Sequence, residues 1–250
     1  KNIDDIVEKF ELIAFFLLNS NKMKCAVNTS QDHVVGITDQ ISRFICLLPA
    51  STSELPSSKK FLPKSIKKFI KMPFDVNYIG KALPGLCYNH PDHPTLVIAA
   101  QLISLKYLHP EIREKGGAYG AGLVHEEQTL RFFSYRDPNI RNTMDVFQKT
   151  HEWIASGIFT NEELEEAKVK IIGKLDAPIS PSDYGNNMFL ASITHKMVQT
   201  FRDRIFETTR EQLTSISDKY LNGCLSSVVV IGADPSQIID ENWEVQDLSI

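Results

Sequence analysis

The sequence predicts an α+β fold in which a mixed or antiparallel sheet is covered by helices. Two alternating apolar and polar runs, at 118–125 and 129–135, are separated by a short polar segment, which is typical of a β-hairpin. Long stretches with apolar residues at helical spacing follow at 139–156 and 160–175. A short apolar run at 227–232 indicates a central strand. Because hairpins and long helices occur together, α+β is favoured over a doubly wound parallel sheet.

Composition places the chain among ordinary globular proteins and excludes several functions. The 250 residues are 42% hydrophobic and 23% charged, which provides enough chain for a sizeable core. The net charge of -4 provides no broad basic field, so we expect no nucleic-acid partner. Four cysteines are widely scattered without C-x-x-C spacing, which argues against a zinc ribbon and a disulfide scaffold: Cys25, Cys46, Cys87 and Cys224.

The first quarter of the chain predicts two helices and a strand. Residues 1–21 form an amphipathic helical lead-in, and the apolar run at 12–18 is too short to cross a membrane. We expect a strand at 22–28 and then a helix over 34–45 that begins after Thr29 or Ser30. The Ser-, Pro- and Lys-rich stretch at 49–63 indicates an exposed loop. No initiator Met or transit-like segment is present, so we expect a piece of a longer protein.

The remaining elements are predicted from periodicity and capping residues. Thr160 and Glu163 form the pattern of a capping box. Thr208 or Thr209, with Gln212, opens a further helix that reaches about Tyr220. Beyond these we expect a strand at 72–84, helices at 93–107 and 184–197, and a surface tail after 234.

The glycine stretch at 113–122, Arg-Glu-Lys-Gly-Gly-Ala-Tyr-Gly-Ala-Gly, is the most informative segment. A phosphate-binding loop requires a strand, then glycines, then a helix. Here the glycines follow a helix and precede a strand, so a nucleotide site is disfavoured. Gly116 and Gly117 are typical of a helix C-cap and tight turn. Gly120 and Gly122 fall on one face of a strand, where glycine often marks the close approach of another backbone, such as a peptide.

This stretch resembles the C-terminal half of the pitrilysin/insulinase clan of zinc metallopeptidases, and most closely the presequence protease branch with its falcilysin-like enzymes. Two further segments, Ser-Tyr-Arg-Asp-Pro-Asn at 134–139 and Asp-Ala-Pro-Ile-Ser-Pro-Ser-Asp at 176–183, support that branch. The resemblance spans about 22–234. It implies a metallopeptidase-like (LuxS/MPP-like) domain at 22–250, preceded by a helical lead-in at 1–21 that comes from another domain.

The resemblance also implies functional roles. In this family the zinc motif lies in the N-terminal half, and the C-terminal half is a degenerate copy that closes over the peptide substrate. By motif, its arginine and tyrosine map onto Arg113 and Tyr119, which are set among Gly116, Gly117 and Gly120. Arginine can hold peptide carbonyls, and a tyrosine hydroxyl can donate to the oxygen that gains charge during hydrolysis. The alternative, which the resemblance disfavours, is a structural role for each: a surface residue of a helix end for Arg113 and a strand aromatic packed in the core for Tyr119.

No catalytic centre or metal site is predicted within the chain. Neither H-E-x-x-H nor H-x-x-E-H occurs. His90 and His93 lie at a proline-flanked helix start, and His125 lies at a predicted hairpin tip, where a solvated side chain is expected. His151 is followed directly by Glu152 on a helix, so the two side chains face different ways. We therefore expect zinc only in the full-length enzyme, bound by an N-terminal domain outside this chain.

Three functions remain open from the sequence. The first is the non-catalytic C-terminal domain of a zinc metalloendopeptidase that degrades peptides, such as organelle targeting presequences, in an enclosed chamber. Its partners would be a peptide and the N-terminal catalytic half of the same polypeptide, with no membrane. The resemblance implies a soluble protein of the mitochondrial matrix or a plastid. The others are a processing-peptidase or respiratory core-protein type subunit, and an inactive peptide-binding scaffold.

Overall fold

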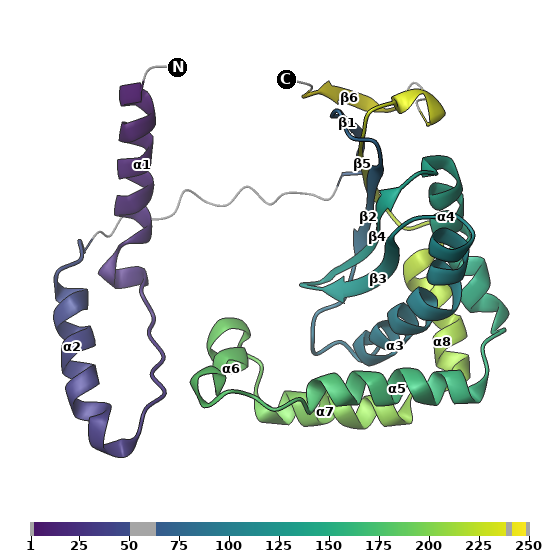
Figure 1. The fold of residues 1–250 in the computed structure, drawn as a ribbon. Coiled ribbons are helices and arrows are strands. Elements are labelled where there is room, and N and C mark those ends of the chain that lie inside the picture. The colour runs from purple at the N-terminus through teal and green to yellow at the C-terminus, as the bar shows by residue number, and fades with distance from the viewer. Residues whose placement is uncertain (1–2, 51–63, 239–241, 249–250) are drawn as a thin grey trace. The chain divides into compact units, whose positions relative to one another are not determined.

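The computed structural model describes residues 3–50, 64–238 and 242–248. The chain divides into two compact units, which are treated separately below (Figure 1). The first comprises Lys1–Phe61 with Pro178–Ser192, and the second Leu62–Ala177 with Ile193–Ile250. The predicted boundary between residues 21 and 22 therefore falls inside the first unit. Most of the loop predicted at 49–63 lies outside the described residues.

The first unit is helical. Its helices are α1 (Ile3–Leu17), α2 (Val34–Cys46) and α6 (Asn186–Ala191). Asn28 joins its two chain segments, because the Asn28 side-chain amide donates to the carbonyls of Ser182 (3.1 Å) and Tyr184 (2.5 Å). The strand predicted at 22–28 is wrong: among the described residues this segment has no strand partner, so its apolar residues have no sheet to join.

The second unit is a six-stranded mixed sheet in the order β3-β4-β2-β5-β1-β6. Strand β1 pairs in parallel with β5 and β6, and the other pairs are antiparallel. The strands are β1 (Lys67–Lys71), β2 (Asn77–Pro84), β3 (Gly120–Glu126), β4 (Thr129–Asp137), β5 (Ser227–Gly232) and β6 (Glu244–Asp247). The α+β class and the mixed sheet are thus confirmed.

Helices cover one face of this sheet (Figure 1). The pattern along β4 shows why: Leu130, Phe132 and Ser134 are buried against the helices, whereas Arg131 and Tyr135 point to the other face and are exposed, as the alternation predicts. The helices are α3 (His93–Ile103), the π-helix η3 (Ser104–Glu114), α4 (Ile140–Ser156), α5 (Asn161–Leu175), α7 (His195–Glu207), α8 (Arg210–Ile216) and the π-helix η5 (Ser217–Leu221).

Two predicted helix starts are confirmed in detail. The Thr160 hydroxyl accepts the Glu163 N–H (3.1 Å), and the Glu163 carboxylate accepts the Thr160 N–H (2.9 Å). Thr209, rather than Thr208, caps α8 with the same reciprocal pattern to Gln212. Each cap satisfies helix N–H groups that have no intrahelical acceptor and contributes about 1 kcal/mol.

Several boundaries differ from the predictions. The central helix continues past 107 as a π-helix, which contains Pro110 and ends at Glu114. The helix predicted at 184–197 is two helices, because Ser192 adopts a left-handed conformation (φ 57°) and Thr194 caps a new helix. The strand predicted at 72–84 begins at 77, β1 was not predicted, and the tail contains β6, which pairs with β1.

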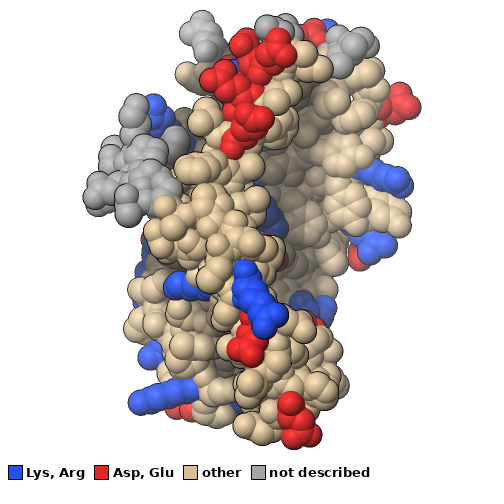
Figure 2. Space-filling view, turned by 90° about the vertical axis from the view of Figure 1, so that its left-hand side faces the viewer, with Lys and Arg blue, Asp and Glu red and all other residues tan. Residues whose placement is uncertain are grey.

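On the face that Figure 2 shows, Lys and Arg side chains are dispersed among uncharged ones rather than gathered. Within the described ranges, no helix has both the length and the apolar character required to cross a membrane.

Candidate functional site

The glycine stretch forms the connection between the π-helix η3 and the edge strand β3. Arg113 lies in the last turn of η3. The chain then reverses at Gly117, whose φ of +80° is readily adopted only by glycine. Two hydrogen bonds return to the helix, from Gly117 N–H to the Arg113 carbonyl and from Ala118 N–H to the Ile112 carbonyl, both 3.1 Å. The predicted helix end and tight turn are therefore present.

Gly116 is required for a different reason. A Cβ at this position would lie 2.5 Å from the Ile112 carbonyl oxygen, which belongs to the preceding helical turn. The Gly116 carbonyl also accepts a hydrogen bond from the Asn139 side-chain amide (2.7 Å). This bond ties the glycine connection to the segment that follows β4, so the two motifs of the resemblance support one another in space.

The motif at 134–139 is organised around a buried carboxylate. Asp137 is fully buried, and its carboxylate accepts hydrogen bonds from the Ser134 hydroxyl (2.5 Å), the Thr143 hydroxyl (2.6 Å) and the Asn139 N–H (2.8 Å). A buried charge is tolerated when several donors satisfy it. Sequence reasoning missed this role, although an Asp directly before Pro-Asn and a helix is a recognisable turn signal.

Arg113 and Tyr119 stand at the two ends of this fixed connection, and both are exposed. Tyr119 is 62% exposed, and within the described residues neither its hydroxyl nor the Arg113 guanidinium has a hydrogen-bond partner. The Tyr119 ring contacts Tyr135 at a centroid distance of 5.6 Å, and the Arg136 guanidinium lies 5.4 Å from the ring centroid. The Tyr119 N–H donates to the Arg136 carbonyl (3.3 Å). The backbone of this connection is held by hydrogen bonds, while the Arg113 and Tyr119 side chains remain exposed.

Gly120 and Gly122 make room for aromatic rings of the neighbouring strand. Gly120 pairs directly with Tyr135, and Gly122 pairs with Phe133. A Cβ at 120 would lie 2.6 Å from Tyr135 Cζ, and a Cβ at 122 would lie 2.8 Å from Phe133 Cζ. Within the described chain, the close approach at these glycines comes from side chains of β4.

The rings continue into an aromatic strip on the face of the sheet that the unit's helices leave uncovered. We use "open face" for this surface, which includes Tyr78 on β2 and Tyr135 on β4, each 38% exposed, and Val229 on β5. Phe133 stacks beside Tyr135 at 6.4 Å. At the outer edge of β3, the Leu123 N–H donates to the Ser104 hydroxyl (2.8 Å), so this edge is satisfied at one point. Tyr119, whose ring contacts Tyr135, thus lies beside this open face.

His125 does not have the solvated environment predicted for it. Its ring is half-buried, its Nε2 accepts the Leu86 N–H (2.9 Å), and it packs on His93 at 4.8 Å between centroids. Desolvation lowers the pKa of both imidazoles, for His93 to about 4, with the charge of His125 adding to the shift at His93. The hairpin tip is formed instead by Glu127 and Gln128, both with positive φ.

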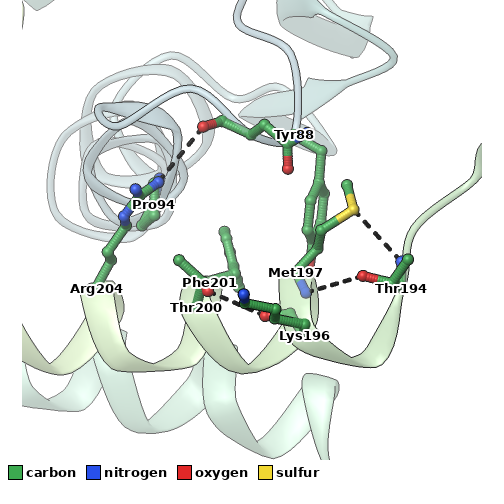
Figure 3. Close-up of a pocket in the computed structure, with 9 residues that line it drawn as sticks. Tyr88, Pro94, Thr194, Lys196, Met197, Thr200, Phe201 and Arg204 are labelled. Carbon is green, nitrogen blue, oxygen red and sulfur yellow. Dashed lines mark hydrogen bonds between the residues drawn. The ribbon is translucent and has the colours of Figure 1, made fainter.

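His93 is enclosed by aromatic rings from two other elements. Tyr88 lies 5.3 Å and Phe201 5.1 Å from its ring centroid. Beside Tyr88, residues of α7 border a cavity of about 240 Å³, in which Met197 and Phe201 face the Tyr88 ring (Figure 3). This is below the usual range for ligand pockets, and Arg204 at its rim already donates to the Asn89 carbonyl (3.4 Å). We assign it no ligand.

A zinc centre does not fit the residues that the structure describes. No three His, Cys, Asp or Glu side chains there converge as a metal site would require. His93 and His125 meet as a pair, but the latter's Nε2 is engaged with backbone, and His90 Nδ1 accepts the Asp92 N–H (3.1 Å). All four cysteines are free thiols.

Comparison with known proteins agrees with the motifs. A family model described as the PreP C-terminal domain matches residues 67–234. The chain belongs to the PreP C-terminal domain family. It is 34% identical over 274 residues to the mitochondrial presequence protease of Xenopus tropicalis, covering 96% of this chain and 27% of the relative. The mitochondrial presequence protease of Emericella nidulans is 33% identical over 262 residues, covering 100% and 24%. The chain thus spans about a quarter of these relatives.

Solved structures show the same fold at low sequence identity. A peptidase M16 inactive domain from Pseudomonas fluorescens aligns with a TM-score of 0.62 at 19% identity, covering 82% of this chain and 52% of that one. Pitrilysin aligns with a TM-score of 0.60 at 9% identity, covering 88% and 26%. The metallopeptidase-like fold expected from the sequence is confirmed, and the chain is a C-terminal domain of the presequence protease type.

Proposed function

We propose that this PreP C-terminal domain is a non-catalytic, zinc-free domain of a zinc metalloendopeptidase that encloses peptides and degrades them. The family match, the curated relatives and the peptidase-like fold support this proposal. Zinc would be held by an N-terminal half of the same polypeptide. The relatives are named mitochondrial presequence proteases, which favours targeting presequences as substrates and the mitochondrial matrix as the location.

The proposal rests on one observation: the Arg113 and Tyr119 side chains are exposed, whereas the backbone between them is fixed. The side chains of Arg113 and Tyr119 have no hydrogen-bond partner in the described chain, whereas the connection between them is fixed by the bonds at Gly116, Gly117 and Ala118. Because the backbone is already fixed, binding would have to order only the two side chains. We assign to Arg113 the binding of peptide carbonyls and to Tyr119 donation to the developing oxyanion.

In this proposal the glycines determine the shape of the backbone and take no direct part in hydrolysis. Gly116 and Gly117 set the turn that separates Arg113 from Tyr119, and Gly120 leaves room for Tyr135, on which the Tyr119 ring rests. The aromatic open face would then lie beside the apolar side chains of an extended or amphipathic peptide. Presequence-like peptides present such side chains in abundance.

The experiment compares the full-length protein with the 250-residue chain. Both are incubated with a fluorogenic amphipathic peptide and with a folded protein of similar charge, and zinc content is measured on the same samples. We expect cleavage of the peptide alone, by the full-length protein alone, and its loss on treatment with a zinc chelator. Chelator-insensitive cleavage, or stoichiometric zinc on the 250-residue chain, would refute the proposal. A folded protein cleaved as fast as the peptide would refute enclosure.

A further inference from the structure

Arg136 occupies a β-bulge at the end of β4, the strand that lies beside β3 (Figure 1). Tyr135 pairs with Tyr78 of β2. The next pair joins Asp137 to Asn77, so Arg136 has no partner of its own on β2. Its φ is +48°, in the left-handed region. In one common class of bulge the residue with this conformation is glycine, so an arginine here is unusual.

The bulge turns the Arg136 side chain out of the alternation of the strand. Because Tyr135 points to the open face, residue 136 of a regular strand would point to the helix-covered face. Instead Asp137 is buried on that face, whereas Arg136 is exposed. The Arg136 guanidinium lies over the Tyr119 ring, 5.4 Å from its centroid. Bulges often redirect a side chain next to a functional site, and here the side chain is redirected to Tyr119.

Neighbouring residues hold Arg136 in its left-handed conformation. The Asn77 side-chain amide donates to the Asp137 carbonyl (2.8 Å), and the Asp137 carboxylate is fixed by three donors. A strained residue persists only where its surroundings fix it in this way. Glycine would adopt the same backbone without strain. The backbone therefore does not require an arginine, and the presence of its side chain needs a separate reason.

The Tyr119 ring provides that reason. The ring is contacted by Tyr135, at 5.6 Å between centroids, and by the Arg136 guanidinium. An exposed tyrosine without a hydrogen bond at its hydroxyl would otherwise exchange rotamers rapidly. A guanidinium over a tyrosine ring is attracted by the ring quadrupole. Within the described residues Arg136 has no carboxylate partner that would draw its side chain away from the ring.

We propose that Arg136 is a positioning residue for Tyr119: its guanidinium holds the phenol ring against Tyr135, so that the hydroxyl is presented to a peptide in one orientation. This inference rests on the proposed role of Tyr119 and deepens it. Arg136 acts on the ring and touches no reacting atom. Its loss should therefore lower kcat with little change in KM, whereas loss of the peptide contact of Arg113 should raise KM.

Substitutions at position 136 separate the backbone from the side chain. In the 250-residue chain, Arg136→Gly should melt about 2–4 °C above Arg136→Ala, because glycine adopts positive φ without strain. Arg131, an exposed residue in the regular part of the same strand, is the control. There the order should reverse, since glycine weakens a strand. If Arg136→Gly melts at or below Arg136→Ala, position 136 is not strained and the proposal is overturned.

Fluorine NMR of the chain labelled with 3-fluorotyrosine observes the Tyr119 ring directly. The chain has seven tyrosines, and Tyr119→Phe identifies the signal of Tyr119. Arg136→Gln removes the charge, so this signal should move toward that of tyrosine in the unfolded chain. Arg136→Lys retains a cation and should restore most of the shift. Arg202→Gln, on α7, should leave the signal unchanged. A Tyr119 signal that Arg136→Gln does not move would overturn the proposal.

Kinetics of the full-length protein connect the ring to hydrolysis of the fluorogenic amphipathic peptide. Arg136→Gly should lower kcat about ten-fold, which is less than the loss expected for Tyr119→Phe. Arg136→Lys should retain more of kcat than Arg136→Gln does. In a Tyr119→Phe background the substitutions at 136 should have no further effect, because the hydroxyl that they misplace is absent.

The kinetic outcomes distinguish this inference from the proposed function. A normal kcat in Arg136→Gly with a lowered kcat in Tyr119→Phe would overturn the positioning role alone. A normal kcat in Tyr119→Phe would refute the proposed role of Tyr119 and, with it, the inference that rests on that role. A loss in Arg136→Gly that persists in the Tyr119→Phe background would show that Arg136 acts on the peptide itself, which also contradicts positioning.

Discussion

The phenol ring of Tyr135 occupies the space that a side chain at position 120 would need. The two residues are direct cross-strand partners, and a Cβ on residue 120 would lie 2.6 Å from Tyr135 Cζ. Tyr135 in turn supports the Tyr119 ring. Gly120 thus leaves room for the ring that supports Tyr119, the proposed oxyanion donor. This packing can be tested by stability measurements, without an activity assay.

Gly120→Val should destabilise the chain by about 1–3 kcal/mol, because the added side chain must displace the Tyr135 ring. Thermal unfolding of Gly120→Val, Tyr135→Ala and the double variant measures the coupling, and the double variant should lose less than the sum of the two. Gly173→Ala is the control: nothing lies within 4 Å of its Cβ position on α5, so helix propensity alone should raise the melting temperature. Strict additivity in the double variant would show that the ring is not the obstacle.

Asp137→Asn should cost about 2–4 kcal/mol in the free energy of unfolding. The amide retains the shape of the carboxylate, but an NH₂ group in place of Oδ2 removes the oxygen to which the Ser134 and Thr143 hydroxyls both donate, and the charge-assisted hydrogen bonds are lost. Chemical denaturation is the measurement. Glu152→Gln, the same change at an exposed position of α4, should alter stability by less than about 0.5 kcal/mol. Equal effects of both substitutions would contradict a role for Asp137 in holding the turn.

Stability should fall as the pH is lowered from 7.5 to 5. His93 has a folded pKa of about 4 against an ordinary value of 6.5, so the unfolded chain binds more protons between these values. Its contribution is complete above pH 6.5 and is lost progressively on acidification, by up to about 2 kcal/mol at pH 5. The ring faces His125 and Tyr88, with His90 nearby, and the pKa of His125 is shifted in the same direction.

The measurement is the melting temperature as a function of pH for the chain and for His93→Gln. The variant should have a shallower dependence between pH 7.5 and 5, whatever its stability at neutral pH. His109→Gln, on η3 and outside this aromatic cluster, should retain the slope of the parent. Parallel curves for the parent and His93→Gln would exclude His93 as the source.

Local patterns predicted local structure well. The Thr160–Glu163 capping box lies within four residues, and the alternation at Leu130, Phe132 and Ser134 fixed which side of β4 is buried. The connection at Gly116 and Gly117 was likewise predicted correctly as a helix end, because positive φ and the absence of a Cβ are properties of single residues.

Features that depend on distant partners were not predicted. Strand β1 has three lysines in five residues, so only its parallel pairing with β5 makes it a strand. His125 was misplaced because the group that engages it, the Leu86 N–H, is 39 residues away in the sequence. The steric requirement for glycine at position 120 could not be predicted without the strand register that places Tyr135 opposite it. The roles of Arg113 and Tyr119 rest on family resemblance and are not decided by local patterns.

The central claim is that Arg113 and Tyr119 act on a bound peptide, and steady-state kinetics of the full-length enzyme test it most directly. Tyr119→Phe removes only a hydroxyl and should lower kcat by about 10²–10³-fold. Arg113→Ala should raise KM as well, because a contact with the peptide is lost in the ground state. Arg202→Ala, an arginine of helix α7 paired with Asp176, is the control and should leave both constants unchanged. The predicted result is a lower kcat for Tyr119→Phe and a lower kcat/KM for Arg113→Ala, with zinc content and melting temperature equal to wild type. If Arg113→Ala and Tyr119→Phe both keep a kcat/KM near wild type, the proposed roles of Arg113 and Tyr119 are contradicted.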